Sequence, residues 1–162
     1  MNLRSLALLG LVLAAAPLAA KPAPRRAGPP QIIPLPLKQV IAAHQRLCTA
    51  RTATGLGYQV LRAGSGARPV GDAAVTVNYI GYLTATGEVF DQATASEFPL
   101  NGVIPGFSEG LALMPAGSIY RLCIPARLAY ADRSVGPIPA NSDLVFQVEL
   151  LPPVPPVSTR KP

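Results

Sequence analysis

Few side chains in this chain of 162 residues could take part in covalent chemistry. It has one histidine, His44, two cysteines, and eight carboxylates scattered along the sequence. A single histidine in a peripheral segment provides no Ser-His-Asp or Cys-His set. The sequence also has no HExxH, CxxC or phosphate-binding glycine loop, and no carboxylate pair is spaced as in glycosidases. Conventional hydrolases, nucleotide enzymes and metal sites are therefore poor interpretations of this chain.

A second set of residues could instead form a non-covalent site. Aromatic residues recur between Tyr79 and Phe146, and the polar residues Asp91 and Tyr130 lie among them. Aromatic walls with one or two polar anchors suit chemistry in a dry pocket. From the residues alone, however, the aromatics fit the core of any small sheet-and-helix protein. Asp91 would then be a turn acid and Tyr130 a surface residue.

Four segments in a fixed order distinguish these interpretations. They run from Val77 to Leu151 and read VNYIGYLTATGEVFD, VIPGFSEGLALMPAG, LAYA and IPANSDLVFQVELL. In order and spacing they resemble the FKBP-type peptidyl-prolyl cis-trans isomerases. The resemblance implies an enzyme that accelerates rotation about X-Pro bonds and uses no nucleophile, metal or cofactor.

Rotation about an X-Pro bond makes and breaks no covalent bond. Its barrier of ~18–20 kcal/mol arises because the planar amide is conjugated. A dry apolar pocket favours the twisted, less polar amide, and fixed donors hold the neighbouring carbonyls. The residue types of the second set are those that this chemistry needs.

The resemblance implies a role for each candidate residue. Asp91 lies beside the twisting amide, and the Tyr130 hydroxyl donates to a substrate or inhibitor carbonyl. The backbone N–H of Ile104 binds a second carbonyl. Phe107 forms the floor, where many relatives have tryptophan. The apolar substrate-binding positions are Tyr79, Phe90, Phe98, Val103, Phe107, Ile138 and Phe146.

Two departures from the family pattern affect the rim of this pocket. Ala131 stands where relatives often have glycine, and the following loop, 132–137, is short and carries Arg133. By resemblance, this rim selects the residue that precedes proline, so the sequence preference is open. An apolar residue before proline is the default expectation, because the walls are apolar.

The spacing of apolar residues predicts the strands and the helix that position these candidate residues. Alternating apolar residues predict strands at 58–62, 75–80, 89–90, 119–124 and 144–151. Residues 105–114 predict a short helix with proline in its first turn and with Phe107, Leu111 and Met114 on one face. The predicted fold is α+β, an antiparallel curved sheet wrapped around one short helix.

The N-terminal region reads as an export signal followed by a spacer. Residues 1–20 have the basic, apolar and small-residue order of a signal peptide, with cleavage near Ala20. The alternative, an uncleaved anchor, needs ~20 apolar residues. Residues 21–36 predict a proline-rich linker and 37–51 an amphipathic helix, within a helical segment 37–56. The isomerase domain is expected over 57–151 and a proline-rich tail over 152–162.

The predicted export indicates the redox state of the two cysteines, and the charge distribution indicates which partners to expect. In an oxidising compartment, Cys48 and Cys123 are expected to form a disulfide. Alternatively, Cys123 is a small buried thiol. The net charge of +6 comes from scattered basic residues, so a nucleic-acid interface is not expected.

The resemblance leads to one main hypothesis and one rival. The main hypothesis is a monomeric periplasmic isomerase acting on proline-containing unfolded or refolding polypeptides and inhibited by rapamycin-type macrolides. The rival is a chaperone-like or partner-binding module of the same fold, since fold does not fix function. Retention of Asp91, Tyr130 and the aromatic set favours the enzyme.

Overall fold

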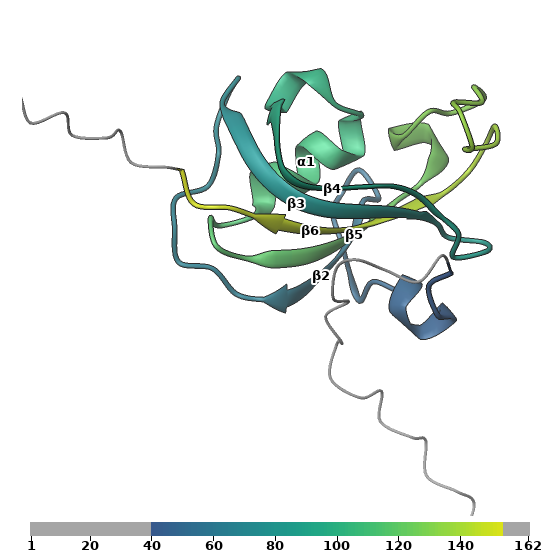
Figure 1. Ribbon diagram of the computed structural model, residues 1–162, viewed down its shortest axis with the longest axis horizontal. Coiled ribbons are helices and arrows are strands. Elements are labelled where there is room, and N and C mark those ends of the chain that lie inside the picture. Colours follow the sequence, from purple (N-terminus) through teal and green to yellow (C-terminus); the bar gives the residue numbers. More distant parts are fainter. Residues whose placement is uncertain (1–39, 154–162) are drawn as a thin grey trace, which may run out of the picture.

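The computed structural model describes residues 40–153, and its main element is one six-stranded antiparallel sheet (Figure 1). The strand order is β1-β2-β5-β6-β3-β4, so β6 lies next to the centre and β4 at an edge. The strands are β1 Ala50–Arg51, β2 Gly57–Arg62, β3 Ala74–Leu83, β4 Val89–Pro99, β5 Ile119–Ile124 and β6 Leu144–Leu150. The predicted α+β class is confirmed.

The one α-helix within residues 40–153, α1 (Pro105–Leu113), packs on one face of this sheet (Figure 1). Pro105 lies in its first turn, where the missing N–H costs nothing. Phe107, Leu111 and Met114 are buried, as the sequence pattern predicts. Three short 3₁₀ helices connect the other elements: η1 Ala43–Arg46, η2 Leu100–Gly102 and η3 Ala126–Leu128.

Successive side chains of β6 point to opposite faces of the sheet, and they contribute to two separate hydrophobic clusters. Leu144, Phe146, Val148 and Leu150 face α1 and belong to the main hydrophobic cluster. Val145 faces the other way and packs with Ile41, Ile80 and Tyr82 in a smaller cluster. The sheet therefore has an inner face under α1 and an outer face covered by residues near position 40.

The segment that covers the outer face corrects one prediction. The described part of the predicted helix 37–51 holds only the four-residue η1, followed by Cys48 and β1. Residues 37–39 lie outside the described part. Tertiary contacts outweigh helical propensity here, because the Tyr82 hydroxyl donates to the Gln45 carbonyl at 2.8 Å and Ile41 N–H donates to the Gly87 carbonyl at 2.7 Å. We call residues 40–49 the N-terminal strap.

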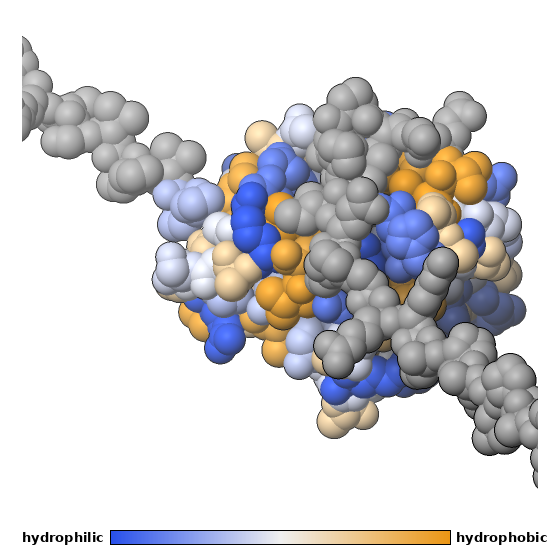
Figure 2. All heavy atoms as spheres, turned by 90° about the horizontal axis from the view of Figure 1, so that it is seen from below, coloured by the Kyte–Doolittle hydropathy of each residue, from blue (hydrophilic) through white to orange (hydrophobic). Residues whose placement is uncertain are grey.

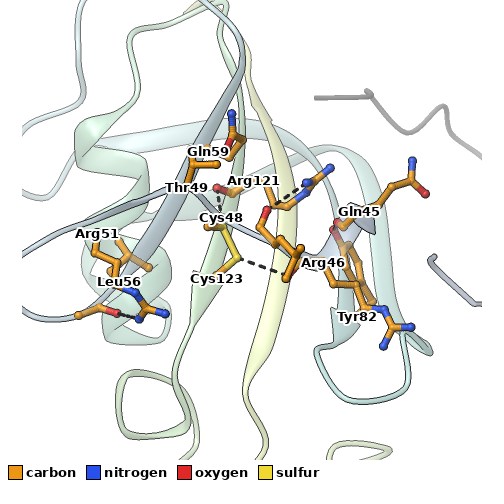
Figure 3. The surroundings of a disulfide bond; sticks show 12 residues. Gln45, Arg46, Cys48, Thr49, Arg51, Leu56, Gln59, Tyr82, Arg121 and Cys123 are labelled. Carbon is orange, nitrogen blue, oxygen red and sulfur yellow. Dashed lines mark hydrogen bonds between the residues drawn. A yellow bond between two sulfur atoms is a disulfide. The ribbon is translucent and has the colours of Figure 1, made fainter. Parts of the chain in front are cut away.

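A disulfide ties this strap to the centre of the sheet. Cys48 and Cys123 are joined with an S–S distance of 2.07 Å and a Cα–Cα distance of 6.1 Å (Figure 3). The neighbouring Arg121 guanidinium donates to the Leu47 carbonyl at 3.1 Å. Figure 2 views the molecule from the strap side, where hydrophobic atoms outside the grey region lie in small patches among hydrophilic ones.

Strand β4 is longer than the sequence predicts. The expected strand ended at Phe90, whereas β4 continues to Pro99 and pairs with β3 from Ala74↔Pro99 to Tyr82↔Val89. Its middle is polar and exposed because it is an edge strand, so no apolar alternation marks it. As a result, Phe98 lies on a strand and not in a loop.

The predicted signal peptide 1–20, the linker 21–36 and most of the C-terminal tail lie outside the described residues. Among residues 40–153, no helix has both the length and the apolar character needed to cross a bilayer.

Candidate functional site

A cavity of about 490 Å³ opens between the sheet, the start of α1 and the loop after η3. Three groups of elements bring its walls together: strands β3, β4 and β6, the η2–α1 junction, and the chain after Leu128. Its lining residues are Tyr79, Phe90, Asp91, Phe98, Gly102, Val103, Ile104, Pro105, Phe107, Ala129, Tyr130, Arg133 and Phe146.

The floor of the cavity is a cluster of aromatic rings. The Phe107 and Phe146 centroids are 4.9 Å apart, and the Tyr79 ring lies 6.2 Å from each of them. Phe90 packs edge-on against Phe146 at 5.5 Å, and Phe98 packs against Tyr79 at 5.8 Å. These separations and tilts are those that aromatic pairs favour. The rings therefore make a dry apolar surface held in place by the sheet and helix.

One acid is held against this surface by a phenol. The Tyr79 hydroxyl donates a hydrogen bond of 2.6 Å to Oδ2 of Asp91. Burial, followed by this bond and by the Asp91 charge, raises the pKa of Tyr79 well above its usual value. The phenol thus stays protonated and keeps one carboxylate oxygen in place, while the Asp91 side chain remains exposed at the cavity wall.

Two hydrogen-bond donors of the cavity lack an acceptor among the described residues. Ile104 precedes α1, and its carbonyl accepts from Phe107 N–H and Ser108 N–H, but its own N–H has no partner in residues 40–153. The Tyr130 hydroxyl likewise has no hydrogen-bond partner within that range. Both groups can therefore donate to a carbonyl of a bound molecule.

Nine of the ten predicted site residues line this cavity, and Ile138 does not. Ile138 is 5% exposed and belongs to the main hydrophobic cluster. It forms a bridge with Val135 through two 2.9 Å backbone hydrogen bonds. Its buried side chain therefore anchors the loop beside the cavity, and its role as a substrate-binding wall stays a prediction.

Four lining residues were not among the predicted site residues: Gly102, Pro105, Ala129 and Arg133. The first three contribute backbone or small side chains, which carry no chemical signature in a sequence. Arg133 was visible only as an unusual residue of the short loop 132–137. Just before that loop, Ala131 has φ 54°, a left-handed conformation that glycine adopts at less cost.

Within residues 40–153, no group of three or more His, Cys, Asp or Glu side chains is placed to hold a metal ion. His44, the histidine of the chain, is exposed on η1, on the strap side of the sheet. The described lining residues offer apolar contact, the Asp91 carboxylate, the Arg133 guanidinium and the donors Ile104 N–H and Tyr130 O–H.

Comparison with known proteins agrees with this arrangement. The chain is 48% identical over 104 residues to the FKBP-type peptidyl-prolyl cis-trans isomerase FkpA of Aeromonas hydrophila, covering 62% of this chain and 38% of that protein. It is 50% identical over 105 residues to the FKBP-type 22 kDa peptidyl-prolyl cis-trans isomerase of Escherichia coli, covering 62% and 50%. The chain thus spans half or less of the length of these relatives.

Solved structures show the same likeness. The crystal structure of FkpA from Escherichia coli matches with a TM-score of 0.61 and 45% identity, covering 64% of this chain and 50% of that one. AtFKBP13 matches with a TM-score of 0.58 and 28% identity, covering 63% and 95%. The sequence model of the FKBP-type peptidyl-prolyl cis-trans isomerases matches residues 66–151, more than half of the 162 residues. The chain therefore belongs to the FKBP-type peptidyl-prolyl cis-trans isomerase family.

Proposed function

We propose that this protein is a peptidyl-prolyl cis-trans isomerase whose active site is the aromatic cavity. The observation that carries the proposal is the combination of an apolar floor with one fixed carboxylate and two unpartnered donors. Ile104 and Tyr130 are partly exposed at the cavity and their N–H and O–H have no acceptor within residues 40–153, so both donors are available to a bound chain. Family membership supports the same conclusion.

Each part of the site has a role in rotating an X-Pro bond. The prolyl ring packs on Phe107 and Phe146, out of water. In this environment the twisted amide, which has lost its conjugation and much of its polarity, costs less than it does in solution. Ile104 N–H and Tyr130 O–H hold carbonyls on either side of the rotating bond, so that one part of the chain is fixed while the other turns.

Asp91 acts on the rotating amide itself. Its carboxylate, oriented by Tyr79, lies at the wall where Phe90 and Phe146 also meet the cavity. Because the charge distribution of the amide changes as it twists, a carboxylate fixed in place before rotation can interact differently with the planar and the twisted amide. No proton is transferred and no covalent bond changes.

We further propose that the protein is exported to the periplasm and acts there as a monomer on unfolded or refolding proteins. The N-terminal residue pattern and the disulfide support export, since such bonds persist in oxidising compartments. Rapamycin-type macrolides are expected to bind the aromatic cavity.

A peptide assay with matched variants tests the proposed activity. The chain from Lys21 onward should accelerate cis-to-trans conversion of Ala-Leu-Pro-Phe peptides without metal or nucleotide. Asp91→Asn and Tyr130→Phe should each lower kcat/KM about tenfold, equivalent to the loss of about 1.4 kcal/mol or roughly one hydrogen bond in the transition state. Glu97→Gln on the same strand and Tyr58→Phe on β2 lie outside the cavity and should leave kcat/KM unchanged.

The rival function is a binding module of the same fold. If the protein folds cooperatively but isomerises peptides no faster than the uncatalysed background, the binding module is favoured over the enzyme. Wild-type rates in both Asp91→Asn and Tyr130→Phe would show instead that the site is wrongly assigned.

A further inference from the structure

The cavity is lined by two charged side chains, and neither forms an ion pair within residues 40–153. Its two charged lining residues are Asp91 and Arg133. Asp91 accepts the hydrogen bond from Tyr79, whereas the Arg133 guanidinium has no hydrogen bond within residues 40–153. The one ion pair of that range joins Arg62 of β2 to Glu149 of β6, and neither residue lines the cavity. Arg133 thus offers a free cation, with five N–H donors, at the mouth of the cavity.

The backbone under this cation is firmly held. Arg133 N–H donates to the Tyr130 carbonyl at 3.1 Å, and Asn141 N–H donates to the Ala131 carbonyl at 2.7 Å. Further along, the buried Ile138 fixes the loop through its bridge with Val135. The loop thus presents Arg133 from a defined position beside Tyr130, while its side chain stays exposed. A preorganised backbone lowers the entropic cost of binding a charged partner.

We propose that Arg133 makes the site selective for proline segments with an aspartate or glutamate next to the proline. This inference rests on the proposed function and deepens it, replacing the expectation of apolar neighbours with one for acidic neighbours. A guanidinium binds a carboxylate through two parallel hydrogen bonds. Because Arg133 is exposed, the preference is about twofold to fivefold, and salt weakens it.

The preference can be measured with two series of blocked peptides. One series carries Glu, Gln, Leu or Lys before the proline, and the other carries them after it. At low salt the wild-type kcat/KM should be about twofold to fivefold higher for Glu than for Gln in at least one series. The ratio should fall toward one as salt is added, and Lys should be the poorest of the four.

Three variants identify the residue responsible. Arg133→Gln should bring the Glu-to-Gln ratio to one. Arg133→Glu should reverse the order, so that Lys exceeds Gln. Arg51→Gln changes the net charge by the same amount from β1, outside the cavity, and should keep the wild-type ratio.

A binding measurement separates this inference from the proposed function. Affinities of the Glu and Gln peptides, measured by NMR titration, report the charge preference whether or not turnover occurs. Failure to isomerise the Leu peptide refutes the isomerase function, and the affinities then decide the role of Arg133. A ratio near one in both series, or a Glu preference that survives in Arg133→Gln, refutes the role of Arg133.

Discussion

The Tyr79 hydroxyl lies 2.6 Å from Oδ2 of Asp91 and joins the inner face of β3 to the edge strand β4. The two residues are twelve positions apart in sequence, yet the antiparallel pairing of their strands brings them to the same wall of the cavity. Tyr79 is also the ring that contacts Phe98, Phe107 and Phe146. One side chain therefore links the apolar floor to the charged wall.

Tyr79→Phe should retain the ring and lose the bond to Asp91. We expect kcat/KM for Leu-Pro peptides to fall about fivefold, equivalent to about 1 kcal/mol of transition-state stabilisation, a usual value for one hydrogen bond. Asp91→Asn and the double variant complete a cycle. If the phenol acts by orienting the carboxylate, the double variant should be no slower than Asp91→Asn alone. Additive losses would contradict that role.

Phe107→Trp should deepen contact with a bound prolyl ring. Phe107 is 4% exposed and forms the floor with Phe146. An indole adds some tens of Å² of apolar contact at about 25 cal/mol per Å², or roughly 1 kcal/mol. Rapamycin-type macrolides should therefore bind several-fold more tightly. Peptide isomerisation should change less, because it depends on Asp91 and Tyr130. Calorimetric titration measures the first quantity, and weaker macrolide binding would show that the floor is misidentified.

Loss of the disulfide should lower stability with little effect on the site. Cys48–Cys123 closes a loop of sequence separation 75, so the chain-entropy model gives a loss of about 4 kcal/mol in the free energy of unfolding. Cys123 packs on the outer face and the cavity lies on the inner face. The double variant Cys48→Ala, Cys123→Ala should thus unfold at lower urea concentration and keep its kcat/KM. Reductant should destabilise the wild type and leave the variant unaffected, and equal urea midpoints would refute the effect.

Tyr82, which packs with the N-terminal strap, should make the free energy of unfolding fall at alkaline pH. Burial raises the pKa of Tyr82 to about 12 from 10, against the lowering effect of Arg121. Between these values the unfolded chain releases the proton and the folded one keeps it. The free energy of unfolding should therefore fall as pH rises from 10 to 12, by up to about 1.4 kcal/mol per pH unit from this group.

Tyr82→Phe isolates this contribution. The variant loses the bond to the Gln45 carbonyl and is expected to be less stable than the wild type below pH 10. Because it cannot titrate, the difference in unfolding free energy between the two proteins should shrink as pH rises from 10 toward 12. Urea unfolding at a series of pH values gives this difference, and a constant gap would contradict the prediction.

Strands β5 and β6 and the helix α1 could be predicted because burial alone sets their pattern. Ile119–Ile124 and Leu144–Leu150 are central strands, and Phe107, Leu111 and Met114 mark the helix face packed on them. The strap and β4 could not be predicted in the same way. The strap is held by a covalent bond and by bonds to distant carbonyls, and β4 is a polar edge strand whose pairing follows from β3.

Site residues on regular strands and the helix could likewise be predicted, whereas those in the loop 130–141 could be predicted only in part. Positions on strands and helix, such as Tyr79, Phe90 and Phe146, line the cavity as the resemblance implies. In the loop 130–141, Ile138 is not among the lining residues, and Arg133, which the sequence analysis noted only as a departure at the rim, lines the cavity. Backbone bonds and the left-handed residues Ala131 and Asn141 shape that loop, and these have no simple counterpart in residue type.

The bond between the strap and β5 also determines how the protein would respond to tension. A pull on residue 40 reaches Cys48 and passes directly to Cys123 beside β6, from whose end the chain leaves the sheet. The residues 49–122 between the cysteines, closed by a bond of sequence separation 75, are then excluded from the stretched path. The oxidised protein should therefore lengthen by about 250 Å less than the reduced one when pulled apart from its ends. If the protein were tethered by its N-terminus, tension would not extend the disulfide-closed loop that contains β2, β3, β4 and α1.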